Sequence, residues 1–201
     1  MAESLFVDDP MNPLFLAIDI GTSSSRTALF DCKGKRISAS TVQQTYSLHT
    51  DSAGAATMKP AALLKAVRDC LTGTLEYRRR HKQLKSWPLM GIGVSCFWHS
   101  LLGTTANGEP VTDIYTWADS RCRVDAAHLR ESFSERAIHS RTGCMLRSSF
   151  WPAKLHWLRR TEPGIFRRVK RWMSPAEWIQ LQLASSANCA FGMATGTGLF
   201  N

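Results

Sequence analysis

The sequence predicts an α/β domain in which a mixed sheet is flanked by helices. Three strand-like segments open the chain, one long amphipathic segment follows, and a few more strands precede a series of helices. Of the 201 residues, 44% are hydrophobic and 20% are charged. This apolar content is enough for a substantial core and gives no reason to expect long disordered stretches.

Three antiparallel strands are expected at the start of the chain. Leu14–Ile20 is a mostly apolar run that ends at Gly21, and Arg26–Phe30 resumes a strand pattern. After residues typical of a turn, Arg36–Val42 is expected to return as the third strand. Residues 1–13 are polar, contain two prolines, and are expected to form a flexible leader.

The longest helix is expected to begin at Pro60, because proline is tolerated in a first helical turn. Further on, residues 90–95 are expected to form a buried strand, and residues 101–105 and 111–116 a hairpin. The apolar stripe predicted for the long helix is Leu63, Leu64, Val67, Leu71 and Leu75. The other helices expected are residues 120–132, 134–140, 152–160 and 175–184.

Cysteine spacing and hydropathy exclude several classes of protein. The six cysteines are widely spread, with no CxxC pair and no zinc-like spacing, so free thiols are expected rather than a disulfide or metal framework. The apolar run at residues 14–20 is too short to span a bilayer and lacks the flanks of a signal peptide. A soluble, cytoplasmic protein is therefore expected.

A formal net charge of +9 raises the question of an anionic partner. The basic residues gather at 77–82 and at 159–171. They are interpreted either as cations at helix C-termini, where they favour the helix dipole, or as a nucleic-acid patch. The first interpretation is favoured because no aromatic residues are interleaved for base stacking.

The segment Asp19–Arg26 has the chemistry of a phosphate-binding turn. Gly21 allows close approach of the backbone to an anion, and the hydroxyl-rich residues 22–24 add donors. A carboxylate such as Asp19 faces phosphates only with a cation between them, most naturally Mg²⁺ with its water shell. An ordinary hairpin turn capped by Asp19 is the alternative. The candidate nucleotide-phosphate-binding residues are Gly21, Thr22, Ser23, Ser24 and Arg26.

Residues 16–31 closely resemble the first phosphate motif of the FGGY carbohydrate kinases, a family with an actin/hexokinase-like (ribonuclease H-like) fold. Further stretches match in the family's order, and together the matches cover nearly all of the chain from Leu14 on. These stretches are residues 91–95 with 98–100, residues 116–121, residues 141–144 with 152–158, and residues 194–201. Any one motif is weak, but five in register are hard to obtain by chance. The resemblance implies that Asp19 helps to hold Mg²⁺, through water, and that residues 21–24 and Arg26 face the phosphates of ATP.

The resemblance also implies a substrate pocket. Trp98 and His99 fall where the family places substrate-contacting side chains, Trp117 matches a tryptophan that packs against substrate, and the carboxylate of Asp119 could bind substrate hydroxyls. The alternatives are core packing for the aromatic residues, and for Asp119 a helix N-cap with Arg121 as its ion-pair partner.

Departures from the family pattern narrow the range of possible substrates. Where glycerol kinase carries an Arg-Glu pair and xylulose kinase a Met-His pair, this chain has Trp98–His99, and Ser149 replaces a substrate-binding tyrosine of glycerol kinase. The motifs look most like the gluconate-kinase branch. A sugar acid is therefore the first expectation and a ketose the second.

The resemblance implies the N-terminal half of a two-domain kinase. In this family the second domain supplies the adenosine pocket, another phosphate motif and the catalytic base, and none of these is found here. Residues 14–201 are therefore expected to be the N-terminal domain, inactive alone and without its C-terminal domain. The alternatives are a non-catalytic sugar- or partner-binding remnant and a basic nucleic-acid-binding protein, and a homodimer stays open.

Overall fold

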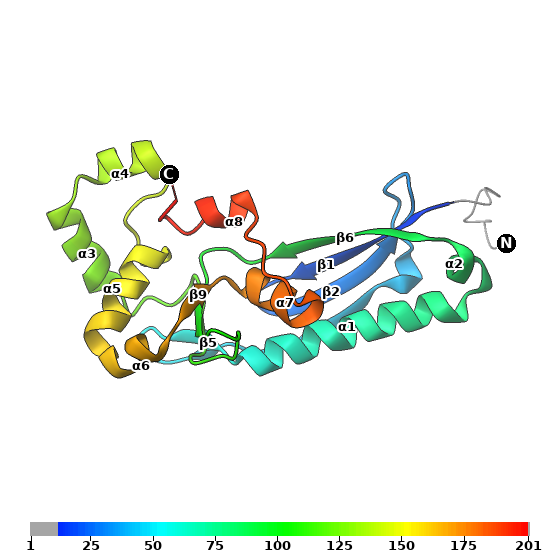
Figure 1. Ribbon diagram of the computed structural model, residues 1–201, viewed down its shortest axis with the longest axis horizontal. Coiled ribbons are helices and arrows are strands. Elements are labelled where there is room, and N and C mark those ends of the chain that lie inside the picture. Colours follow the sequence, from blue (N-terminus) through cyan, green and yellow to red (C-terminus); the bar gives the residue numbers. More distant parts are fainter. Residues whose placement is uncertain (1–11, 201) are drawn as a thin grey trace. The chain divides into compact units, whose positions relative to one another are not determined.

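The structure, a computed structural model, describes residues 12–200 and forms two compact units (Figure 1). Unit 1 holds the described residues up to Thr45 together with Lys65–Ser95. Unit 2 holds Tyr46–Leu64 and the residues from Cys96 on. The predicted leader, residues 1–13, lies outside the described residues except for its last two positions.

Unit 1 contains a four-stranded sheet with the order β3-β2-β1-β6. The antiparallel part consists of β1 (Leu14–Ile20), β2 (Ser24–Phe30) and β3 (Val42–Thr45). The fourth strand, β6 (Leu89–Cys96), lies beside β1 and points in the same direction in Figure 1. The predicted mixed sheet is confirmed.

The third strand begins later than predicted. Instead of Arg36–Val42, the chain forms a short 3-10 helix, η1 (Ser38–Ser40), and enters β3 only at Val42. The Ser40 hydroxyl accepts a hydrogen bond from the backbone N–H of Leu29 at 2.8 Å, which replaces a strand-to-strand bond at this position. A serine side chain that competes in this way favours a turn over a strand.

Helix α1 (Pro60–Arg80) begins at the predicted proline, and Leu63 and Val67 of the predicted stripe are fully buried, but toward its C-terminal end the helix buries other residues than predicted. Leu75 is 41% exposed, whereas Cys70 and Thr74 are fully buried. The Thr27 hydroxyl of β2 donates to the Cys70 carbonyl oxygen at 2.8 Å and lies 2.6 Å from the Thr74 hydroxyl oxygen. Small polar side chains therefore bond the helix to the sheet where leucines were expected to pack. A second helix, α2 (Lys82–Ser86), follows.

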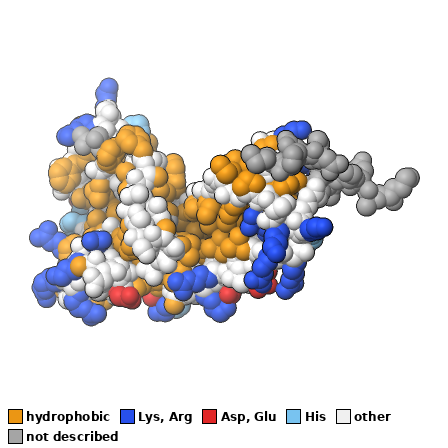
Figure 2. Space-filling model, turned by 45° about the vertical axis from the view of Figure 1, so that its right-hand side comes forward, with side chains coloured by type: hydrophobic (Ala, Val, Ile, Leu, Met, Phe, Trp, Pro, Cys, Tyr) orange, Lys and Arg blue, Asp and Glu red, His pale blue; other side chains and the backbone are white. Residues whose placement is uncertain are grey.

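Strand β6 exists as predicted, but the expectation that it is buried is wrong. Its side chains Met90, Ile92 and Val94 are 65%, 60% and 55% exposed. Among the described residues β6 pairs only with β1 and forms one edge of the sheet, so one side of it stays open. Figure 2 shows hydrophobic side chains at the surface of this part of the molecule.

Exposed apolar edge strands invite pairing with another chain. Ile92→Lys is therefore expected to reduce self-association in sedimentation velocity while it changes the free energy of unfolding by no more than about 0.5 kcal/mol. Ile18→Lys, at a position only 4% exposed in the same sheet, is the control that should destabilise the fold strongly. Unchanged association in the Ile92 variant would show that β6 is not the sticky edge.

Unit 2 contains two small sheets and most of the helices. One sheet has the order β4 (His49–Thr50), β5 (Ala56–Met58), β8 (Ile114–Tyr115), and the other pairs β7 (Leu102–Thr104) with β9 (Arg171–Met173). The helices are α3 (Arg123–Ser132), α4 (Glu135–Thr142), α5 (Trp151–Thr161), α6 (Pro163–Arg168), α7 (Pro175–Ala184) and α8 (Phe191–Thr195).

The predicted hairpin around residues 107–110 is only partly formed. Leu101 and Tyr115 exchange backbone hydrogen bonds of 3.1 and 2.9 Å, as a hairpin requires. However, β7 and β8 belong to different sheets. A buried cluster of Leu101, Tyr115, Trp151 and Leu158 forms a core of this unit. The six cysteines, all within the described residues, form no disulfide, and no described helix is long and apolar enough to cross a membrane.

A buried carboxylate joins α3 to α5. Asp125 is fully buried and accepts hydrogen bonds from His156 Nδ1 at 2.7 Å and from Arg160 Nε and Nη2 at 3.1 and 2.8 Å. Burial raises the pKa of the Asp125 carboxyl, but the bonds and charges of Arg160 and His156 outweigh it and hold this pKa below its ordinary value. The ionised form therefore stabilises the fold.

Asp125→Asn is expected to lower the free energy of unfolding by about 2 kcal/mol, because a charged hydrogen-bond acceptor is lost in the core. A carboxyl with a lowered folded-state pKa contributes fully above its ordinary pKa of about 3.9 and loses its contribution as the pH falls below that value. Urea titrations of both proteins should thus differ at neutral pH and converge in acid. An equal difference at both pH values would contradict the assignment.

Candidate functional site

The predicted phosphate turn is the β1–β2 hairpin of unit 1. Asp19 and Arg26 face each other in the strand register, and the Gly21 N–H donates to the Ser24 carbonyl oxygen at 2.8 Å to close the turn. A Cβ atom at Gly21 would lie 3.1 Å from that same oxygen, so the turn is tight enough to favour glycine. The sequence thus forms a compact loop directly after the carboxylate at the end of β1.

Asp19 and Arg26 are both open to solvent, with side chains 56% and 52% exposed, and their charged groups are 3.9 Å apart. A pair this exposed and this long contributes little to stability, so both groups are available to a ligand. Ser23 is exposed and Thr22 half-buried, but Ser24 is only 7% exposed. The accessible hydroxyls of the turn are therefore those of residues 22 and 23.

The donor set of this turn fits a hydrated Mg²⁺ beside phosphates. Among the described residues no group of three or more His, Cys, Asp or Glu side chains could hold a metal by itself. Mg²⁺ characteristically keeps several waters and takes one or two carboxylates plus phosphate oxygens. One open carboxylate, Asp19, next to a hydroxyl-bearing turn and an arginine meets that requirement.

In unit 2, one hydroxyl joins the backbones of Trp98 and Trp117, and the Trp98 and His99 ring centroids lie 5.8 Å apart. Ser100 Oγ donates to the Trp98 carbonyl oxygen at 3.2 Å and accepts the backbone N–H of Trp117 at 3.0 Å. Ser100 itself is fully buried, whereas Trp98 and Trp117 are 51% and 49% exposed. The core-packing alternative is therefore wrong for both tryptophans, whose rings are presented at the surface.

His99 is held in a strained backbone conformation and a fixed orientation. Its φ of 60° lies in the left-handed region, which costs a non-glycine residue roughly 1–2 kcal/mol. Its Nδ1 lies 2.6 Å from the Gly196 carbonyl oxygen, and its ring centroid is 4.3 Å from that of Phe150. Because a carbonyl only accepts, Nδ1 carries the proton, and in the neutral ring Nε2 is an acceptor. Strain of this kind is concentrated at functional sites.

Asp119 lies beneath the surface. It is 2% exposed, and its oxygens accept bonds from Arg121 Nε at 3.1 Å, Arg121 Nη2 at 2.6 Å and the Ala56 N–H at 3.3 Å. The guanidinium of Arg121 in turn stacks 4.5 Å from the Trp157 ring centroid. The alternative proposed for Asp119 is therefore half right. The predicted ion pair with Arg121 is present, but the N-cap of α3 is Cys122 and not Asp119. A direct contact of Asp119 with substrate stays a prediction.

Sequence reasoning missed three residues that shape this region: Ser100, Phe150 and Gly196. Ser100 directly follows Trp98–His99, and Gly196 lies in the late Gly-Thr-Gly motif. Their places in these motifs could have pointed to both residues. Phe150 carried none, because its contact with His99 joins residues far apart in the chain.

Comparisons with known proteins identify the family of this chain. The model of the FGGY family of carbohydrate kinases, N-terminal domain, matches residues 14–201. A gluconokinase of Bacillus subtilis is 26% identical over 95% of this chain and 36% of that protein. A xylulose kinase of Lactococcus lactis is 29% identical over 92% of this chain and 36% of that protein.

The fold is shared with a sugar kinase of known structure. The crystal structure of gluconate kinase from Lactobacillus acidophilus superposes with a TM-score of 0.84 at 24% identity, covering 94% of this chain and 37% of that one. The chain therefore spans little more than a third of the length of these relatives. The match extends over residues 14–201. The chain therefore belongs to the FGGY family of carbohydrate kinases and corresponds to the N-terminal domain of that family.

Proposed function

We propose that this domain belongs to a cytoplasmic, ATP-dependent kinase that phosphorylates a hydroxyl of a sugar acid resembling gluconate, with a ketose as the second choice. The observation that carries the proposal is the half-exposed Trp98–His99–Trp117 group, with its imidazole oriented by Gly196. Apolar ring faces suit the C–H groups of a sugar, and a fixed imidazole suits its hydroxyls. The similarity to gluconokinases supports the choice of substrate.

The phosphate turn gives this kinase its nucleotide contacts. ATP supplies the transferred phosphoryl group when it is bound. Asp19 would hold a hydrated Mg²⁺, the turn Gly21, Thr22, Ser23 and Ser24 would surround the phosphates, and Arg26 would donate to phosphate oxygens. Because Ser24 is only 7% exposed, the hydroxyls open to the phosphates would be those of Thr22 and Ser23.

On the substrate side, His99 Nε2 would accept a hydrogen bond from a sugar hydroxyl, while Trp98 and Trp117 would pack against the ring or chain of the sugar. The carboxylate of Asp119 holds the guanidinium of Arg121 by two hydrogen bonds. A direct bond from Asp119 to a substrate hydroxyl requires Arg121 to release one carboxylate oxygen.

The catalytic base is expected outside these residues. The three aspartates nearest in sequence to Trp117 each have a cationic partner. Asp113 pairs with Lys59 at 2.9 Å, Asp119 with Arg121, and Asp125 with Arg160. A carboxylate whose oxygens already accept hydrogen bonds from a cation is a poor acceptor for the proton of a substrate hydroxyl, because its lone pairs are engaged. The purified chain is therefore expected to show no phosphorylation above background.

A coupled assay with gluconate, xylulose, ribulose and glycerol tests this proposal. The 201-residue chain should stay at background, whereas a chimera that joins it to the C-terminal part of the Bacillus subtilis gluconokinase should phosphorylate gluconate in the presence of Mg·ATP. Turnover by the chain alone would overturn the assignment of the base. A folded chimera that binds Mg·ATP and turns over none of the four would favour a non-catalytic remnant.

Nucleic acid is an unfavourable alternative partner. The two groups of basic residues, at 77–82 and at 159–171, belong to different units. A nucleic-acid interface would place them along a groove or a single helix face.

A further inference from the structure

Lys154 is a charged side chain with almost no access to water. It lies on α5 and is 1% exposed, beside the buried residues Ala153 and Leu158. Burial lowers the pKa of the Lys154 amino group from its usual value. Keeping a cation out of water costs several kcal/mol unless its hydrogen bonds are satisfied. A role for the head group itself is therefore required, since leucine or methionine would fill the same space without that cost.

The bonds of the Lys154 head group join two segments of unit 2. Its Nζ donates to the Asp119 carbonyl oxygen at 3.0 Å and to the Ser148 carbonyl oxygen at 2.6 Å. Both acceptors are backbone atoms, so these bonds fix positions of the chain. The Cys122 thiol also donates to the Ser148 carbonyl oxygen, at 3.1 Å, and strengthens the same junction.

Each of the two segments carries part of the proposed substrate group. The segment with Asp119 contains Trp117, whose backbone N–H is bonded to Ser100. The segment with Ser148 ends at Phe150, whose ring contacts His99. The Lys154 head group therefore lies between the supports of the Trp117 ring and of the His99 ring.

We propose that Lys154 is a positioning residue whose head group sets the spacing between Trp117 and the Phe150–His99 pair. The effect on sugar affinity rests on the proposed function, whereas the effect on the positions of these rings does not. Lys154 touches no reacting group in this arrangement and acts through the two backbone carbonyls.

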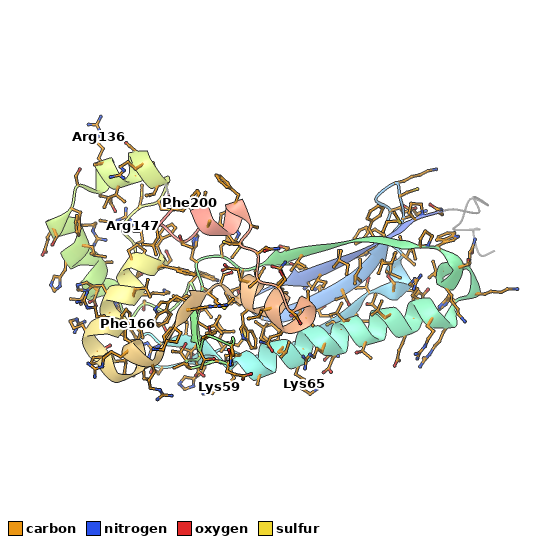
Figure 3. All side chains as sticks on the ribbon, in the orientation of Figure 1. Lys59, Lys65, Arg136, Arg147, Phe166 and Phe200 are labelled. Atoms are coloured by element: carbon orange, nitrogen blue, oxygen red, sulfur yellow. The ribbon has the colours of Figure 1, made fainter. Side chains whose placement is uncertain are left out.

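Lys154→Met is the test, because methionine keeps most of the volume and removes all three donors. Lys65→Met is the matched control: Lys65 projects from α1 into solvent, with its side chain 76% exposed (Figure 3). Asp125→Asn is the second control, since it weakens the α3–α5 connection without touching either carbonyl. The readouts are the indole N–H signal of Trp117, the ring signals of His99 and the affinity for gluconate.

Lys154→Met is expected to move the signals of Trp117 and His99 and to weaken gluconate binding about tenfold, the effect of losing roughly 1.4 kcal/mol. Neither control should do so. A folded Lys154→Met protein whose Trp117 and His99 signals coincide with those of the wild type would overturn the proposal. If the wild type binds none of the sugars, the proposed function fails, and Lys154 is still judged on the ring signals.

Should Lys154→Met not fold, Lys154→Arg decides the question. Arginine keeps the charge and the donors but presents a larger, planar head group to the two carbonyls. It is expected to shift the Trp117 and His99 signals while the signals around Asp125 stay in place. Unchanged Trp117 and His99 signals in this folded variant would reject the positioning role.

Discussion

Asp19→Asn is expected to lower kcat of the chimeric kinase by about 10²–10³-fold, the usual cost of removing one electrostatic contact to a transition state. The substitution keeps the shape of the side chain but removes the charge that would hold Mg²⁺. Because Asp19 is exposed and its pair with Arg26 is long, thermal stability should not change measurably. The measurement is the coupled assay over a range of Mg²⁺ concentrations.

The matched control for Asp19 is Asp69→Asn. Asp69 is also an exposed carboxylate of unit 1 and pairs with a neighbouring lysine on α1. It should leave kcat unchanged. Near-normal turnover by the Asp19 variant would rule out the role assigned to that carboxylate.

His99→Ala is expected to weaken sugar binding by about tenfold, because a hydrogen bond accepted by a fixed imidazole contributes about 1 kcal/mol and the adjoining ring contacts are lost as well. The melting temperature should stay within a few degrees of the wild type, since His99 is only half-buried and its bond to Gly196 contributes about 1 kcal/mol. Isothermal titration and thermal unfolding give the two quantities.

His99→Asn and His128→Ala complete that experiment. Asparagine tolerates the left-handed backbone better than alanine does, so the Asn variant separates loss of the imidazole from backbone strain. His128 lies on α3, outside the proposed group. A large loss of stability in His99→Ala with unchanged sugar affinity would show that His99 is a structural residue only.

Local sequence signals predicted several elements closely. Helix α7 spans Pro175–Ala184 as predicted, because Ser174 and Glu177 form a capping box and Pro175 takes the first turn. Strand β1 was equally clear, as an apolar run that stops at Gly21. Signals of this kind lie within a few residues of the element itself.

Elements that depend on distant partners could not be predicted in the same way. Strand β9 forms because Met173 pairs with Leu102, and β5 because Thr57 pairs with Tyr115. Each segment is only three residues long, which is too short to show a strand pattern of its own. The prediction that β6 is buried failed for the same reason. The burial of a strand depends on which elements lie beside it rather than on its own composition.

The candidate site also has features that could be predicted from the sequence and features that could not. The residue types of the phosphate turn and of Trp98–His99 were readable from their motifs. Whether Trp98 and Trp117 lie in the core or at the surface was not, because tryptophan occurs in both places. The burial of Lys154 runs against the usual preference of lysine and follows only from two carbonyls that the fold brings to it.

The central claim, a sugar site formed by unit 2, is tested most directly by a titration of the chain with gluconate, xylulose and glycerol, followed through its tryptophan indole and histidine ring signals. Gluconate, or failing that xylulose, should shift the signals of Trp98, Trp117 and His99 saturably, and glycerol should not. Trp178, which is 2% exposed, should stay unchanged throughout. Saturable binding that leaves Trp98, Trp117 and His99 unshifted, or no binding of any of the three, would contradict the account.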